Sequence, residues 1–435
     1  MMTSKHKWSI AFIVILVVVY LVLLFIQKEN NGTEVIEIYF ADRITAAHKI
    51  LIDEYNQLNK GKIKVVPIDF PNFDFSTNER KEVLARSLRG TGDGIDLFAV
   101  DIIWVQRFAK WCEPLDKYFT EDEKKRILPQ ALASCYSQGE LVAVPLDLVQ
   151  GIMYYREDLL KELVNGEEII NKISNDITWE EFLKVHSILK KENPFYIYPA
   201  ADYEGLICSY IELVLSLKLN YFEEYGFNFE KPEAEKALQL LVDLVNKFRT
   251  TPKEVTKYTE IPSYQHFIKN DGFFIRGWPS YDKDFRELPV DLEKEKKLKK
   301  APLPHFKEGE PTSVFGGWNL MISKFSDKKQ AVVDFVKFLL SDKSQEIFFR
   351  EGGYYPIINK IYEDSSYSKK YPELLQIRKL LASGVHRPAH EDYTRYSKIM
   401  SSYIVQAINN DISVKDALRM ITSSIQLEKN VVKEF

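Results

Sequence analysis

The chain has 435 residues, of which 45% are hydrophobic and 28% are charged, and its formal net charge is −4. This length is too great for one ordinary hydrophobic core and predicts two domains, while the composition excludes a disordered chain. The weak negative charge provides no basic surface for nucleic acid, so we expect no nucleic-acid partner.

The first element of the chain is an apolar run from Trp8 to Ile26 that contains no charged residue. Its 19 residues are enough to cross a hydrocarbon core, and the positive charge ahead of it places residues 1–7 in the cytoplasm. The run is longer than the apolar part of a cleaved signal peptide, and no small-residue cleavage site follows it. We therefore predict an uncleaved transmembrane signal anchor over 8–26, a spacer over 27–34, and an extracytoplasmic remainder at the cell membrane. A buried core helix is the alternative.

The residues after the spacer alternate between strand and helix patterns. Strands are expected over 35–41, 62–70 and 95–101, and helices over 44–60, 78–90 and 102–111. Strands that alternate with helices predict an α/β fold with a mostly parallel sheet that is covered on both faces.

A break near 139–155 separates this region from a middle that is mostly helical. Helices are expected over 179–192, 205–220 and 232–248, a strand over 271–278, and a charged connector over 292–306. Strand and helix patterns then return, with an apolar strand after Gly317, an amphipathic helix over 327–341 and a late helical segment over 394–427. This order predicts two lobes whose segments alternate along the chain, with a ligand cleft at the crossing points.

Polar residues at two predicted strand ends are candidates for contacts in that cleft. Asp101 follows a buried strand and either caps the next helix or accepts hydrogen bonds from vicinal sugar hydroxyls, and both alternatives stay open. Asp147 and Gln150 follow a second apolar run and precede Gly151. They either bond an uncharged polyol or remain solvated on a surface crossover.

Aromatic residues beside glycine and proline are the second group of candidates. Trp278 and Tyr281 lie on a loop after a strand, where they either stack on a sugar or pack in the core. In SVFGGWNLMIS, Gly317 and Trp318 form either a tight turn with a core tryptophan or bare backbone and an aromatic plate against a ligand. Arg387, which precedes Pro388, is a further candidate contact.

Catalytic, metal and cofactor chemistry is not expected from the motifs. His386 and His390 have metal-pair spacing, but the proline between them breaks a helix, so we expect no metal site. The three cysteines form no Cys-x-x-Cys pair, and buried free thiols are favoured, with a disulfide between Cys112 and Cys135 left open. No nucleophile elbow, phosphate loop or dinucleotide fingerprint is present, and no carboxylate pair is marked for glycoside hydrolysis. A glycoside hydrolase remains an alternative.

An ordered set of segments resembles one protein family. The chain resembles the extracellular solute-binding proteins of ABC sugar importers, especially the trehalose/maltose-binding branch, in DLFAVDIIWVQRFAKWCEPLDKYF, GELVAVPLDLVQGIMYYREDLL, FIKNDGFFIRGWPSY, SVFGGWNLMISKFSDKKQ and RPAHEDYTRYSKIM. The resemblance covers roughly residues 34–427. It implies a two-lobed periplasmic-binding-protein fold of type II, with lobe I over 35–145 and 301–362 and lobe II over 146–300 and 363–435.

The resemblance also implies a function and its residues. The expected function is extracytoplasmic binding of a di- or oligosaccharide by a monomer, without catalysis or cofactor, for delivery to ABC permease subunits. A membrane-anchored sensor of the same fold is the alternative. By position, the family's cleft residues correspond to Asp101, Trp104, Trp278, Tyr281, Gly317, Trp318 and Arg387. The segment PLDLVQG departs from the family, with Asp147 where an aromatic residue is common and Val149 where an acidic one is common, so the sugar is not specified.

Overall fold

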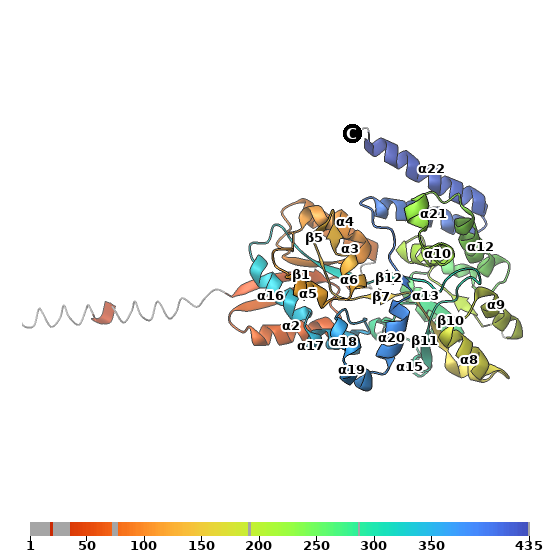
Figure 1. Cartoon of the computed structure of the whole chain (residues 1–435), viewed down its shortest axis with the longest axis horizontal. Helices are drawn as coiled ribbons and strands as arrows, with labels where there is room; N and C mark the ends of the chain where they lie inside the picture. Colours follow the sequence, from red (N-terminus) through yellow and green to blue (C-terminus); the bar gives the residue numbers. More distant parts are fainter. Residues whose placement is uncertain (1–17, 21–34, 72–76, 190–192, 286–287, 434–435) are drawn as a thin grey trace, which may run out of the picture.

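The computed structural model of the chain describes residues 18–20, 35–71, 77–189, 193–285 and 288–433. Two β-sheets, each packed with helices, lie side by side in it and form two lobes (Figure 1). The predicted anchor over 8–26 lies outside the described residues, apart from the three helical residues 18–20. Within the described ranges, no helix is both long enough and apolar enough to cross a bilayer.

The first sheet contains the three predicted N-terminal strands. Its strand order is β2-β1-β3-β13-β6, with β1 (Ile36–Asp42), β2 (Ile63–Asp69), β3 (Leu97–Asp101), β6 (Val144–Pro145) and β13 (Trp318–Ile322). β1 pairs in parallel with β2 and β3, whereas β13 runs antiparallel to both β3 and β6. The prediction of a mostly parallel sheet therefore holds for its N-terminal half, and β13, which enters from a distant part of the chain, makes the sheet mixed.

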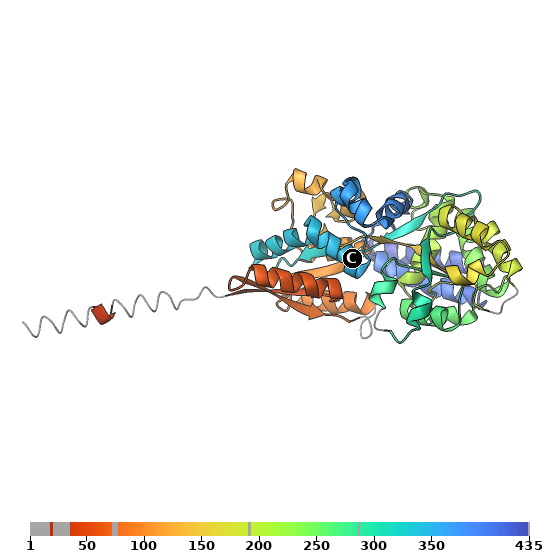
Figure 2. The same ribbon diagram turned by 90° about the horizontal axis from the view of Figure 1, so that it is seen from below.

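Helices from both ends of the chain cover this sheet. They include α2 (Ala46–Leu58), α3 (Thr77–Arg89), α16 (Lys329–Leu339) and α17 (Asp342–Ile347). α2 begins at Thr45, whose hydroxyl accepts from the backbone N–H of His48 in a capping box. Figure 2 shows α2 and α16 side by side along the first lobe, and both contact the sheet. The predicted helix over 102–111 is broken into η1 (Ile102–Trp104), α4 (Val105–Phe108) and η2 (Ala109–Trp111).

The second sheet corrects one prediction. Its order is β11-β8-β10-β9, with β8 (Ile152–Arg156), β9 (Tyr196–Ile197), β10 (Phe274–Gly277) and β11 (Leu298–Ala301). The segment 292–306, predicted as a connector, contains α15 (Leu292–Glu295) and the edge strand β11, which pairs antiparallel with β8. Lysine at an edge strand discourages pairing with other chains, and the lysines of β11 concealed its strand pattern.

A helical layer packs on the second sheet. It contains α8 (Gly166–Asn175), α9 (Trp179–Ile188), α10 (Glu204–Leu217), α12 (Pro232–Asn246), α13 (Glu260–Lys269), α21 (Tyr393–Ile408) and α22 (Val414–Lys433). The late segment 394–427 was predicted as one helical stretch. It is a helical hairpin, because the chain turns at Asn410, which has a φ of +63°.

A third sheet joins the two lobes. Its order is β14-β12-β7, with β7 (Val149–Gln150), β12 (Ser313–Gly316) and β14 (Gly384–Val385), and β7 and β12 lie between the lobes in Figure 1. β12 and β13 are separated only by Gly317, whose φ is +125°, yet they belong to different sheets. The predicted strand after Gly317 is confirmed as β13, whereas β12, before it, was not predicted. Gly317 is a point where the chain crosses between lobes.

Short elements complete the described fold. They are α5 (Glu121–Lys125), α6 (Pro129–Ala133), β4 (Tyr136–Ser137), β5 (Glu140–Leu141), α7 (Glu157–Lys161), α11 (Tyr221–Tyr225), η3 (Lys253–Lys257), α14 (Tyr281–Asp284), the π-helix η4 (Phe348–Gly352), α18 (Asn359–Glu363), α19 (Ser365–Lys370) and α20 (Glu373–Leu381). Cys112, Cys135 and Cys208 are buried free thiols, so no disulfide joins Cys112 to Cys135.

Candidate ligand-binding cavity

A cavity of about 420 Å³ lies between the lobes and is lined by residues from both. Its volume falls within the range of small-molecule sites. The first lobe contributes Arg43, Arg80, Asp101 and Trp318, among others, and the second contributes Tyr203, Glu204, Glu260, Trp278, Tyr281 and Asp284. Asp147 joins the lining from the crossover between β6 and β7. Aromatic rings and charged groups therefore line the same cavity.

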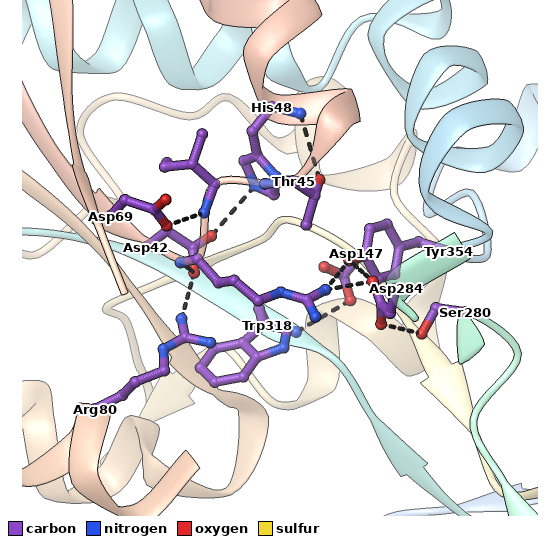
Figure 3. Close-up of polar contacts among 12 residues, drawn as sticks. Asp42, Thr45, His48, Asp69, Arg80, Asp147, Ser280, Asp284, Trp318 and Tyr354 are labelled. Atoms are coloured by element: carbon purple, nitrogen blue, oxygen red, sulfur yellow. Dashed lines mark hydrogen bonds and ion pairs between the residues drawn. The ribbon is translucent and has the colours of Figure 1, made fainter. Parts of the chain in front are cut away.

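Trp318 forms the wall of the first lobe. It begins β13 and is half-buried, and the guanidinium carbon of Arg80 lies 3.8 Å from its ring centroid (Figure 3). Arg80, on α3, is itself ion-paired with the buried carboxylate of Asp42, and the other oxygen of Asp42 lies 3.2 Å from Nε2 of His48. The indole is thus supported by a cation that a buried carboxylate fixes in place.

Trp278 forms the wall of the second lobe in the same way. The guanidinium carbon of Arg276 lies 4.1 Å from its ring centroid, and Nη2 of Arg276 donates to Oε1 of Glu212 at 2.8 Å. Both partners are almost fully buried, and β10 and α10 hold them in the interior. Each tryptophan therefore lies against an arginine that is paired inside its own lobe.

The two glycines before Trp318 pack closely against other parts of the protein. A Cβ on Gly316 would lie 3.0 Å from the ring of Trp278, and a Cβ on Gly317 would lie 2.6 Å from the carbonyl oxygen of Asp147. The predicted role of Gly317, bare backbone for an approaching sugar, is therefore incomplete. The space above the glycine pair is filled by protein atoms, and the glycines let the two lobes pack closely beside the cavity.

An ion pair joins the lobes directly. Nη2 of Arg43, after β1, donates to Oδ1 of Asp284 on α14 at 2.5 Å. The hydroxyl of Tyr354 donates to the same oxygen at 3.0 Å, and that of Ser280 donates to the other oxygen at 2.7 Å. These contacts connect the end of the first strand with the loop that carries Trp278.

Asp147 is a buried carboxyl group with only a weak donor. The backbone N–H of Trp318 donates to its Oδ1 at 3.3 Å, and the side chain is 2% exposed. Burial, together with the charges of Asp42 and Asp284, raises the pKa of Asp147 well above its usual range. Burial likewise raises the pKa of Glu260 at the start of α13. The cavity therefore has two carboxyl groups whose environment favours the neutral form.

Arg387 connects both lobes at the opposite side of the lining. Its Nη2 donates to Oδ1 of Asp101 at 2.8 Å and its Nη1 donates to Oε1 of Glu204 at 2.7 Å. Asp101 also accepts from the backbone N–H of Ile103 at 3.0 Å, which confirms the capping alternative. It lines the cavity as well, and its contact with a sugar stays a prediction. Burial opposes the charge of Arg387, but the two carboxylates outweigh it and raise the pKa of the guanidinium.

Comparison with known proteins identifies the family. Residues 40–346, which are well over half of the chain, match the family described as bacterial extracellular solute-binding protein. The chain belongs to this family. The predicted resemblance is confirmed, and the folded part of the protein is extracytoplasmic.

Individual relatives agree with this assignment. A probable ABC transporter-binding protein of Deinococcus radiodurans is 25% identical over 338 residues, which cover 75% of this chain and 77% of that protein. The maltose-bound MalE3 of T. maritima has a TM-score of 0.80 at 26% identity, over 90% of this chain and 99% of that one. The cyclic alpha-maltosyl-1,6-maltose binding protein of Arthrobacter globiformis has a TM-score of 0.69 at 21% identity, over 90% of this chain and 98% of that one, and shares the fold. The predicted two-lobed α/β fold and a solute-binding function related to ABC sugar importers are confirmed.

Most of the predicted contact residues of this solute-binding protein are brought together at the cavity. Seven of them belong to its lining: Asp101, Asp147, Trp278, Tyr281, Gly317, Trp318 and Arg387. The hydroxyl of Tyr281 is buried there, and no described residue is its hydrogen-bond partner. Tyr281 begins α14 instead of lying on a loop, whereas the other six lie at strand ends or on the loops that follow strands.

Trp104 and Gln150 lie outside the lining. Trp104 is buried and packs edge-on against Trp318, with ring centroids 6.5 Å apart. The Gln150 amide is fully buried and donates to Oγ of Ser313 at 3.0 Å and to the carbonyl of Leu380 at 2.9 Å. Both residues support the cavity from behind, because packing and internal hydrogen bonds occupy their side chains.

The histidines near Arg387 make internal hydrogen bonds. Nε2 of His386 donates to the carbonyl of Gln130 at 2.8 Å, and Nδ1 of His390 accepts from the backbone N–H of Asp392 at 3.0 Å. These contacts fix the segment that carries Arg387.

Sequence reasoning missed several lining residues. They are Arg43, Arg80, Tyr203, Glu204, Glu260, Asp284 and Tyr354. Arg43 directly follows the first predicted strand, so the rule that ligand sites lie at strand ends would have found it. The other six lie within or beside helices, where charged and aromatic residues carry no positional signal.

Proposed function

We propose that this solute-binding protein holds a di- or oligosaccharide in the cavity between its lobes and delivers it to the permease subunits of an ABC importer. The observation that carries the proposal is the pair of half-buried tryptophans, Trp278 and Trp318, that line one cavity from opposite lobes. Sugars present flat C–H faces that stack on aromatic rings, and hydroxyl groups that bond carboxyl and guanidinium groups. The maltose-bound MalE3 of T. maritima, a structural relative, supports a sugar as the ligand class.

The lining residues divide into two roles in this proposal. Trp278 and Trp318 stack on the sugar rings, while Asp101, Asp147, Tyr281 and Arg387 exchange hydrogen bonds with its hydroxyls. Gly317 shapes the backbone between the two walls. Binding involves no covalent step, so neither a metal nor a cofactor enters the proposal.

Closure of the lobes is the expected response to binding. Lobe I, over 35–145 and 301–362, and lobe II, over 146–300 and 363–435, move about the crossings near Gly317. The ion pair between Arg43 and Asp284 joins the two sides. A permease that recognises the closed shape accepts the loaded protein and rejects the empty one.

A single-pass anchor completes the proposal. Residues 8–26 hold the monomeric binding protein at the cell membrane, with residues 1–7 in the cytoplasm. Membrane fractionation tests this: the full-length chain should resist carbonate extraction, and a chain that begins at residue 35 should leave the membrane fraction. Full-length chain in the soluble fraction would contradict the anchor.

Thermal unfolding of the full-length chain in mild detergent, against a panel of mono-, di- and oligosaccharides, tests the sugar function. A ligand at 100 times its Kd stabilises the folded state by about 2.7 kcal/mol, which raises Tm by several degrees. A selective rise in Tm supports the proposal. No rise with any member of the panel would contradict it.

A further inference from the structure

Carboxylates outnumber cations around the cavity. Apart from Glu79 at the rim, seven carboxyl groups and four guanidinium groups among the residues that the structure describes line the cavity or support its tryptophans: Asp42, Asp101, Asp147, Glu204, Glu212, Glu260 and Asp284, with Arg43, Arg80, Arg276 and Arg387. This set has three more carboxyl groups than guanidinium groups. Buried Lys81 behind the first wall is paired with Glu82.

Every arginine of this set already has a carboxylate partner. Arg80 is paired with Asp42, Arg43 with Asp284, and Arg276 with Glu212. Arg387 is shared between two carboxylates. A phosphate or carboxylate on a ligand would therefore have to break an existing ion pair, and an anionic sugar is disfavoured.

Asp147 and Glu260 are the carboxyl groups left over. Neither has an ion-pair partner among the described residues, although each lines the cavity, Asp147 from the crossover between β6 and β7 and Glu260 from the start of α13. Asp147 is 2% exposed and has only the 3.3 Å contact with the backbone N–H of Trp318. The buried, unpartnered hydroxyl of Tyr281 lies in the same lining. Buried polar groups with unfilled bonding capacity mark where a ligand has to supply partners.

We propose, on the assumption that the proposed sugar-binding function is right, that the cavity selects a sugar that carries a protonated amino group, with Asp147 as its main partner and Glu260 as the second. An ammonium group donates three hydrogen bonds and supplies the positive charge that the lining lacks. Its charge offsets the cost of burying an ionised carboxyl group, which a neutral hydroxyl does not.

Proton release accompanies this binding. Asp147 faces Asp42, Asp284, Arg43 and Tyr354, and burial together with the two acids keeps it protonated in the empty cavity. An incoming ammonium group favours the ionised form, so the carboxyl proton passes to the solvent. Affinity for an amino sugar should therefore rise with pH until the amine itself loses its proton, while affinity for a neutral sugar should show no such rise.

Isothermal titration of the full-length chain in mild detergent compares sugars that differ in one group. Glucose, trehalose and cellobiose are each paired with their 2-amino counterparts, with the N-acetyl forms as neutral controls of size and glucuronate as the anion. We expect at least one amine to bind 10-fold or more tightly than its hydroxyl counterpart, with a binding heat that depends on the buffer because a proton is released. Hydroxyl forms that bind as tightly as the amines would overturn the inference and leave the proposed function standing. Failure of every sugar would overturn both.

Variants that remove a carboxyl charge but keep the size of the side chain test whether the amine preference depends on that charge. Asp147→Asn keeps the size of the side chain and should reduce the amine preference to 2-fold or less, and Glu260→Gln should reduce it by a smaller factor. Asp122→Asn on α5, whose side chain is 93% exposed, is the matched control and should leave the preference unchanged. A preference that survives in both cavity variants contradicts the inference, and Glu260→Gln keeps the test open if Asp147→Asn does not fold.

Discussion

The two tryptophan walls of the cavity are alike in chemistry and different in setting. Trp278 lies against Arg276, which Glu212 holds, and Trp318 lies against Arg80, which Asp42 holds. Arg276 is in the middle of β10, with strands on both sides, whereas Arg80 is in the first turn of α3 at the edge of the cleft. One wall is built into a sheet, and the other is built on the end of a helix.

The pKa shifts of the two arginines also indicate that the two walls are not equally fixed. Burial opposes the charge of both guanidinium groups, but Glu212 outweighs it in Arg276 and raises the pKa. In Arg80 burial prevails, with Arg43 as a second opposing charge, and the pKa is lowered despite Asp42. The wall of the second lobe is therefore the more firmly fixed of the two. The wall of the first lobe is the one we expect to adjust when a ligand binds.

The largest expected effect comes from removing the carboxylate that holds Arg276 against Trp278. Glu212→Ala leaves Arg276 buried without its partner, and the free energy of unfolding should fall by about 3–5 kcal/mol in denaturant titrations. Asp42→Ala should cost less, because the end of a helix lets Arg80 move toward solvent. Glu428→Ala, which removes the surface partner of Arg395, is the control and should cost less than about 1 kcal/mol. Equal losses for Glu212 and Asp42 would remove the distinction between the walls.

The next largest effect is expected at Gly317, where the chain crosses between the lobes. Gly317→Ala forces a side chain into a positive φ and places its Cβ 2.6 Å from the carbonyl of Asp147, so the free energy of unfolding should fall by about 2–3 kcal/mol. Gly61 also has a positive φ, of +78°, but nothing lies within 4 Å of its Cβ position. Gly61→Ala should therefore cost only about 1 kcal/mol, which isolates the steric part. A Gly317→Ala variant as stable as Gly61→Ala would show that the lobes do not need this close contact.

Much of the fold could be predicted because the local pattern of apolar residues determines these helices and strands. The alternation over 35–41 gives β1, and the apolar spacing over 44–60 gives α2. β11 was missed because five of the seven residues over 294–300 are lysine, which leaves no apolar pattern to indicate a strand. Pairing with β8 makes it a strand. The turn at Asn410 was missed because no proline or glycine marks it.

The site was predictable only where strand ends or the family resemblance marked it. Asp101 and Trp318 lie at such ends, and both line the cavity. The ion pairs could not be predicted from the sequence, because Arg43 and Asp284 are 241 residues apart and the chain has 63 acidic residues from which to choose. Gln150 shows the converse, since its amide nitrogen donates two internal hydrogen bonds that no sequence pattern reveals.

A smaller effect compares the two walls in binding. Trp318→Ala and Trp278→Ala each remove one stacking surface, and sugar affinity should fall by about 1–1.5 kcal/mol, or roughly 5- to 15-fold, in isothermal titration. Trp278→Ala should also lower Tm, because it empties the space above Gly316. The Phe variants should recover part of the affinity. Loss of folding in Trp318→Ala, without a specific loss of binding, would instead make Trp318 a core residue.

The last expected effect concerns the carboxyl group of Asp147, between the walls. Its raised pKa means that folded Asp147 holds its proton at pH values where the unfolded chain, with an aspartate pKa near 4, has released it. The unfolded state then binds fewer protons, so the free energy of unfolding falls as pH rises, by up to about 1.4 kcal/mol per pH unit. Carboxylates with lowered pKa values, such as Asp42, act in the opposite direction, but only as pH falls below about 4.

Denaturant titrations of the ligand-free protein at pH 5, 6 and 7 test this dependence. Asp147→Asn cannot ionise, so it should flatten the decline in stability with pH and gain stability over the unmodified protein as pH rises. Parallel pH profiles for the two proteins would mean that Asp147 ionises at an ordinary pH. Asp147 would then carry an uncompensated negative charge beside Trp318 even without a ligand. The position of the first-lobe wall would in that case depend on Arg43 and not on the protonation state of Asp147.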